Sequence, residues 1–182
     1  MNHEVETKKG KWMRAANRYK QELGLTWEDL KTMERRNLKL AIREWDSQKW
    51  REELEEKPTL KWYKQGKPNI QYDQCYTNNI SSNYSAKART NTLQVQEYLH
   101  RRNRNHDKTC KLCGLEDEDL QHFLVTCPML ESKRDREIME AWRNIDKMKQ
   151  TVDILFKEKR YDKTRGMIKR MWLHRKDLLR PP

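Results

Sequence analysis

The strongest constraint on this chain is a short segment that concentrates three of its four cysteines. Cys110, Cys113, His122 and Cys127 follow the pattern C-x2-C-x8-H-x4-C. Two cysteines separated by two residues can both reach one ion from a tight turn, and a short helix over residues 119–126 would supply the other two groups. Zn²⁺ takes four such sulfur and nitrogen ligands in its structural sites. The sequence therefore predicts that these four residues bind zinc.

Two alternative explanations of this segment are weaker. Cysteines that only fill a core as small apolar side chains do not explain three of them within 18 residues. The acidic stretch at residues 116–119 precedes the predicted short helix, where the helix dipole favours negative charge, and this explanation is preferred to a Mg²⁺ site. The fourth cysteine, Cys75, lies outside the pattern and is interpreted as a free thiol.

The composition limits how the rest of the chain folds. The chain has 182 residues, of which 35% are hydrophobic and 37% charged, and it contains only 5 Gly but 7 Trp and 7 Tyr. This length supports one or two compact units, which excludes a large multidomain enzyme. We expect a mostly α fold, in which the zinc knuckle is inserted between the helices of a small assembly.

Apolar residues at helical spacing predict where the helices lie. A capping box of Thr26 and Asp29 would begin a long helix that ends near Pro58. Further helices are predicted over residues 85–102, 128–144, 149–159 and 161–179. The predicted organisation is an N-terminal helical segment (1–63), a polar linker or loop (64–85), and a zinc-binding helical module with a basic C-terminal helix (86–182).

The net charge of +12 indicates a polyanionic partner. The last 32 residues hold half of the excess, with 10 basic and 4 acidic side chains. The predicted partner is RNA or DNA, bound through its backbone phosphates. One predicted contact group is Arg101, Arg102, Arg104, Lys108 and Lys111, and the second is Lys163, Arg165, Lys169, Arg170, Arg175 and Lys176. Solvated helices that happen to be rich in Lys and Arg are the alternative explanation of the charge.

Several classes of protein are disfavoured by motifs that the sequence lacks. The chain has no apolar run long enough to span a membrane and no secretory signal, so we expect an intracellular protein of the nucleus or cytoplasm that does not contact a membrane. The patterns G-x4-G-K-[ST], G-x-G-x-x-G, G-x-S-x-G and H-E-x-x-H are absent, so we expect no enzyme activity.

The neighbourhood of the cysteines resembles a known family. In order along the chain come A-R-T-N-T-L at residues 88–93, C-x-x-C-G at 110–114, the acidic stretch, L-x-H-F-L at 120–124 and C-P at 127–128. Together, residues 86–130 resemble the zinc-binding region that lies C-terminal to the reverse transcriptase of non-LTR retrotransposons. The resemblance implies that Cys110, Cys113, His122 and Cys127 bind zinc and assist the handling of nucleic acid.

The resemblance does not extend to a catalytic centre. The Tyr-x-Asp-Asp motif of a polymerase is absent, and so is the Pro-Asp of the endonuclease that follows the zinc region in some elements. We therefore expect a non-catalytic, zinc-stabilised nucleic-acid-binding module that is a C-terminal fragment of a retrotransposon reverse transcriptase protein. The alternatives are a zinc-stabilised helical module for binding a protein partner and a decayed element remnant.

Overall fold

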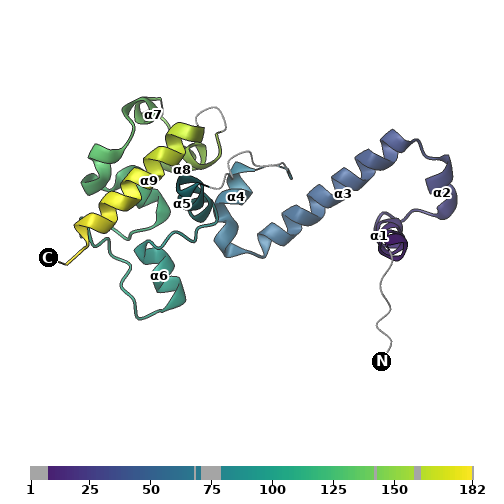
Figure 1. Ribbon diagram of the computed structural model, residues 1–182, viewed down its shortest axis with the longest axis horizontal. Coiled ribbons are helices and arrows are strands. Elements are labelled where there is room, and N and C mark those ends of the chain that lie inside the picture. Colours follow the sequence, from purple (N-terminus) through teal and green to yellow (C-terminus); the bar gives the residue numbers. More distant parts are fainter. Residues whose placement is uncertain (1–7, 68, 71–78, 142, 158–160, 182) are drawn as a thin grey trace. The chain divides into compact units, whose positions relative to one another are not determined.

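Helices and the loops between them make up the described chain. The computed structural model describes residues 8–67, 69–70, 79–141, 143–157 and 161–181, without the side chains of residues 8, 9, 11 and 12. Within these ranges there is no strand, and one isolated bridge pairs Thr109 with Asp117. No described helix is long and apolar enough to cross a membrane. The predicted mostly α fold is confirmed (Figure 1).

The chain divides into two compact units, Met1–Glu53 and Leu54–Pro182. The first contains α1 (Lys8–Glu22), α2 (Trp27–Thr32) and most of α3 (Arg35–Glu55). Sequence reasoning missed α1. This helix ends where Gly24 adopts a φ of 64°, while the N–H groups of Gly24 and Leu25 bond back to the carbonyls of Gln21 and Lys20. That pattern is a Schellman motif, which favours glycine at the left-handed position.

The predicted long helix after Thr26 is two helices. The capping box is present: Asp29 N–H donates to Thr26 Oγ1 over 3.1 Å, and Thr26 N–H donates to the Asp29 carboxylate over 2.7 Å. The helix stops at Met33, whose backbone is extended. Thr32 Oγ1 lies 3.0 Å from the carbonyl of Glu28 and 3.3 Å from that of Asp29. Hydroxyl bonds of this kind slightly destabilise a helix, and α2 ends directly after Thr32.

The first unit has little core. Its best-defined contact is the edge-on packing of Tyr19 against Trp45, with ring centroids 5.4 Å apart. None of its described side chains is fully buried, and Met13, Trp27 and Leu40 are 40%, 45% and 46% exposed. The apolar side chains of this unit therefore pack only partly.

The second unit contains the remaining helices and the metal centre. The longer elements are α5 (Ile80–Arg89), α8 (Lys147–Phe156) and α9 (Tyr161–Leu178). The short ones are η1 (Pro58–Leu60), α4 (Lys61–Gly66), α6 (Gln96–Arg102), η2 (His122–Thr126), η3 (Pro128–Lys133) and α7 (Arg136–Glu140). The two C-terminal helices, α8 and α9, lie close to their predicted positions.

One hydrophobic cluster holds the second unit together. In it α9 packs against α5 and η3, while α4 packs against α8. Phe123 and Trp172 meet edge to face, with ring centroids 5.9 Å apart. Trp62 belongs to the same cluster and is only 1% exposed. The predicted segment boundary at residue 63 therefore falls inside this unit.

Helix α5 differs from the predicted helix over residues 85–102 at both its start and its end. It begins at Ile80 rather than Ser85, because the Asn79 side chain caps it by accepting from Ser82 N–H over 2.9 Å. It also ends at Arg89 instead of continuing to Arg102. Asn91 takes a left-handed φ of 52°, a conformation that Asn tolerates better than most residues, and α6 starts only at Gln96.

Other predicted segments also differ in part. Residues 64–85 are predicted as a linker or loop, yet α4 runs to Gly66 and α5 begins at Ile80. Residues 68 and 71–78, with Cys75, lie outside the described residues.

Residues 128–144 are predicted as one helix, but they are split into η3 and α7. Asp135 ends the first by capping the second, where it accepts from Ile138 N–H. Trp142 lies outside the described residues.

Candidate metal centre

A tight turn presents the first two cysteines. Cys110 N–H donates to the carbonyl of Glu116 over 2.9 Å, and Gly114 N–H donates to the carbonyl of Cys110 over 2.8 Å. Gly114 has a φ of 67°, which lets the chain reverse directly after Cys113. These backbone bonds place the Cys110 and Cys113 thiols on one side of the turn.

A single π-helical turn presents the other two ligand groups. Asp119 Oδ1 accepts from His122 N–H over 2.7 Å at its start, and Cys127 N–H donates to the carbonyl of His122 over 2.8 Å at its end. The predicted short helix is thus present with π geometry. Its wider turn brings Cys127 back toward His122, five residues earlier, and such turns are common at functional sites.

The four side chains converge with the spacing of a tetrahedral metal site. The ligand atoms of Cys110, Cys113, His122 and Cys127 all lie within 4.8 Å of one another. Cys110 Sγ and Cys127 Sγ are 3.9 Å apart, and Cys113 Sγ lies 3.4 Å from His122 Nε2. Bond lengths of about 2.3 Å to sulfur and 2.0–2.1 Å to nitrogen would separate tetrahedral ligand atoms by roughly 3.5–3.8 Å. The residues fit zinc.

Burial and hydrogen bonds shift the pKa values of the three thiols. Burial raises the pKa of Cys127 to about 12, with a further contribution from the neighbouring Cys110. Burial also raises the pKa of Cys110. At Cys113 burial acts in the same direction, but hydrogen bonds from the Leu115 N–H and from the other two thiols outweigh it and lower the pKa. Without a cation, the two buried thiols therefore hold their protons at neutral pH, and metal binding displaces them.

Glu116 orients the histidine. Its Oε2 lies 3.0 Å from His122 Nδ1, and Thr126 Oγ1 lies 3.0 Å from the same nitrogen. A carboxylate only accepts hydrogen bonds, so Nδ1 carries the proton and the Nε2 lone pair faces Cys113. Carboxylate partners of this kind fix the ring orientation of metal-binding histidines. Glu116 is not among the predicted site residues, and its position six residues before His122 is the one sequence signal for this role.

The rest of the acidic stretch has separate tasks. Asp119 caps the π turn, as the predicted helix-terminus role requires. Glu118 is fully buried and receives hydrogen bonds of 2.5 and 2.6 Å from the Arg175 guanidinium and one of 3.0 Å from Gln96 N–H. Asp117 lies on the surface, 3.7 Å from Lys108 Nζ.

The first predicted phosphate-contact group lies beside the metal centre, at the end of α6 and in the loop after it. Arg102, Arg104, Lys108 and Lys111 are exposed. Arg101 is half-buried, where its guanidinium donates to the carbonyl of Asn91 over 2.5 Å and lies over the Tyr98 ring. Four of the five side chains thus remain accessible to a ligand.

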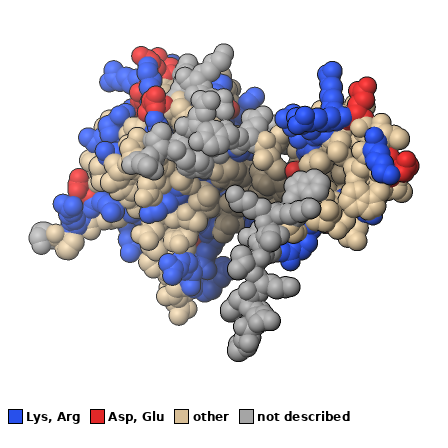
Figure 2. Space-filling model, turned by 45° about the vertical axis from the view of Figure 1, so that its right-hand side comes forward, with Lys and Arg blue, Asp and Glu red and all other residues tan. Residues whose placement is uncertain are grey.

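The side chains of the second predicted phosphate-contact group, on α9, differ in their exposure and pairing. Arg175 is 5% exposed and paired with Glu118, which removes it from the candidate contacts. Lys163 pairs with Glu137, and Arg165 pairs with Asp162 and bonds Ser82. Of the three remaining members of this group, Arg170 and Lys176 are exposed and Lys169 is half-buried. Over both units, Lys and Arg side chains form several separate groups on the face shown in Figure 2.

A comparison with protein families decides what the metal centre resembles. Residues 45–132 match a family model described as zinc-binding in reverse transcriptase. This region resembles the zinc-binding region associated with retrotransposon reverse transcriptase. The match contains all four ligand residues and confirms the predicted resemblance. No curated protein and no solved structure matches the chain.

The match begins much earlier than residue 86, where the sequence resemblance starts. It includes α4, whose Trp62 lies in the same hydrophobic cluster as Cys110 and Cys127. The described residues of this earlier part contribute no side chain to the four-residue cluster, and Trp62 contributes to the core behind it.

Proposed function

We propose that the chain is the non-catalytic, zinc-binding module of a retrotransposon reverse transcriptase protein and that it binds RNA or DNA through backbone phosphates. The observation that carries the zinc assignment is the convergence of Cys110, Cys113, His122 and Cys127 within a region that matches a zinc-binding family. Four protein ligands leave no open position for a catalytic water, so the bound ion has a structural role. Once bound, it supplies fixed coordination that crosslinks the turn to the π helix.

The charge of the chain and the accessible Arg and Lys side chains support nucleic-acid binding. A net charge of +12 attracts polyanions, and Arg102, Arg104 and Lys111 are exposed next to the metal centre. Contacts to phosphates give affinity without sequence recognition, and each contact releases counterions. Binding therefore weakens steeply as salt is added.

Metal content and nucleic-acid affinity test the two parts of the proposal separately. Native mass spectrometry of the parent should show one zinc per chain, with zinc lost in Cys127→Ser and retained in Cys75→Ser, the control outside the ligand set. Fluorescence anisotropy with labelled RNA and DNA at several salt concentrations then measures binding. A parent without zinc overturns the metal assignment, whereas a zinc-loaded parent that binds neither RNA nor DNA overturns the nucleic-acid function.

A second candidate function is binding of a protein partner through the first unit. The observation in its favour is the exposure of Met13, Trp27 and Leu40 in a unit without fully buried described side chains. Trp27→Ala is a better test than a change at Trp45, which packs against Tyr19 and supports the unit itself. Loss of partner capture with unchanged helicity and nucleic-acid binding would favour the protein interface.

A further inference from the structure

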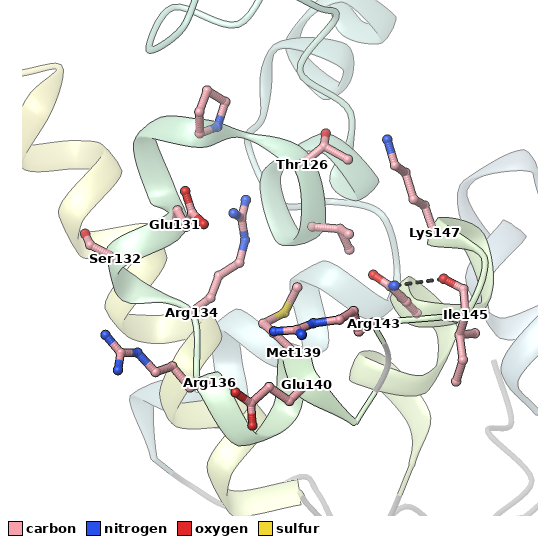
Figure 3. A pocket seen from close by; sticks show the side chains of 13 residues that line it. Thr126, Glu131, Ser132, Arg134, Arg136, Met139, Glu140, Arg143, Ile145 and Lys147 are labelled. Atoms are coloured by element: carbon pink, nitrogen blue, oxygen red, sulfur yellow. Dashed lines mark hydrogen bonds between the residues drawn. The ribbon is translucent and has the colours of Figure 1, made fainter.

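A cleft opens beside the candidate metal centre. Its volume is about 1200 Å³, and it lies between η2, η3, α7 and the start of α8 (Figure 3). Pockets for single small molecules measure roughly 300–1,000 Å³. The cleft is therefore large enough for a segment of an extended chain.

Positive charge dominates the walls of the cleft. Four basic side chains line it, against two acidic ones, Glu131 and Glu140. Arg136, Arg143 and Lys147 are exposed, and none of the three has an ion pair within the described part of the chain. In Figure 3, Arg143 extends across the cleft while Arg136 and Lys147 lie at opposite ends of its rim. These three cations are spaced along the opening and are available to an anionic ligand.

The fourth cation ties the cleft to the metal centre. Arg134 Nε donates to the carbonyl of Leu124 over 3.0 Å, and its Nη2 donates to the carbonyl of Cys127 over 2.8 Å. Both carbonyls belong to the segment that ends at the last metal ligand. Arg134 therefore connects one wall of the cleft to the segment that carries Cys127.

Apolar atoms lie between the charged groups. Val125 and Ile145 are partly buried and pack against the hydrophobic cluster, and Met139 is half-buried and points toward the cleft in Figure 3. Gln150 Nε2 donates to the carbonyl of Ile145 over 2.8 Å and fixes that residue's backbone. An apolar strip flanked by cations matches a nucleotide, which has a flat base and an anionic phosphate. A base inside a duplex cannot reach such a strip because it is stacked between its neighbours.

We propose that this cleft binds an unpaired segment of RNA or DNA. Its phosphates contact Arg136, Arg143 and Lys147, and a base lies against the strip formed by Val125, Met139 and Ile145. The inference rests on the proposed nucleic-acid function and adds to it a site and a strand state.

The test compares three variants of the zinc-loaded chain by fluorescence anisotropy. The cleft variant carries Arg136→Ala, Arg143→Ala and Lys147→Ala. The control carries Arg35→Ala, Arg36→Ala and Lys39→Ala, which removes the same charge from exposed positions of α3. The third variant is Met139→Ser. The probes are a labelled oligouridylate, an oligothymidylate and a hairpin duplex of equal length, and zinc content and circular dichroism confirm that each variant folds.

We expect the parent to bind the two single strands more tightly than the duplex. The cleft variant should bind them about tenfold more weakly, with a salt slope shallower by about 2, because each lost phosphate contact removes roughly 0.7 from the slope. Met139→Ser should weaken binding by roughly threefold at an unchanged slope, since apolar contacts release no counterions. The control should retain the parent's slope. The relative affinities of the two single strands decide between RNA and DNA.

Three results would overturn the inference while leaving the broader function intact. The first is that the cleft and control variants bind the single strands with equal affinity. The second is that the parent binds the duplex as tightly as the single strands, and the third is that polyglutamate displaces the strand as readily as unlabelled oligonucleotide does. A parent that binds none of the probes would instead overturn the proposed function itself.

Discussion

At the scale of single residues, the metal centre depends on a side chain that is not a ligand. Glu116 accepts from His122 Nδ1 and thereby directs Nε2 toward the thiols. Glu116→Ala should weaken zinc binding by about 10–100-fold, because outer hydrogen-bond partners of metal ligands contribute effects of this size. Competition with a chromophoric chelator measures the change. Asp117→Ala is the matched control, since its side chain is exposed and pairs with Lys108 on the surface; equal zinc affinities in the two variants would contradict the assigned role.

Arg175 is the residue whose predicted and observed roles differ most. It forms a buried pair with Glu118, 57 positions earlier in the chain. Arg175→Met should lower the free energy of unfolding by about 3–5 kcal/mol, because it leaves the Glu118 carboxylate buried without its partner. The double variant Glu118→Gln/Arg175→Met should recover much of that loss. Urea denaturation measures both, with exposed Lys176→Met as the control. If the double variant were no more stable than Arg175→Met, the loss would not come from the unpaired Glu118 carboxylate.

At the scale of elements, the close approach of α4 and α8 explains why position 66 is a glycine. Gly66 ends α4, and a Cβ atom built on it would lie 2.2 Å from Cδ2 of Phe156 in α8. Gly66→Ala should therefore cost about 1–3 kcal/mol of stability, as overpacking does. Gly166→Ala in α9 is the opposite control, because the nearest atom there is the flexible end of Arg170, at 3.4 Å. It should raise stability by roughly 0.5–1 kcal/mol. Thermal unfolding of the pair distinguishes steric crowding from a general effect of glycine.

The sequence predicted those elements whose determinants are local. The spacing of the four ligands and the Thr26 capping box lie within a few turns of chain, and both are found in the structure. The breaks at Thr32 and Asn91 are also local, but hydrophobic spacing registers neither the hydroxyl bonds of Thr32 nor the left-handed backbone of Asn91. Contacts between distant segments, such as Glu118 with Arg175, could not be predicted because no periodicity encodes which helices meet.

At the scale of the whole molecule, the two units should respond differently to metal removal. The segment that carries the ligands also supplies fully buried core residues, among them Leu120, Phe123 and Leu124, whereas no described side chain of the first unit is fully buried. Coordination and core packing in the second unit are thus formed by the same stretch of chain. Loss of zinc should therefore loosen the metal-binding segment and the core packing together.

Hydrogen exchange followed by mass spectrometry tests this coupling. After chelation, peptides from residues 108–134 and from α9 should lose protection, since α9 packs on η3 and its Trp172 lies against Phe123. Peptides from α1 and α2 should exchange at the same rate with and without zinc. Cys127→Ser should reproduce the pattern without chelator. If α9 kept its protection when zinc was absent, the core would fold independently of the centre, and the ion would serve only to order the local turn.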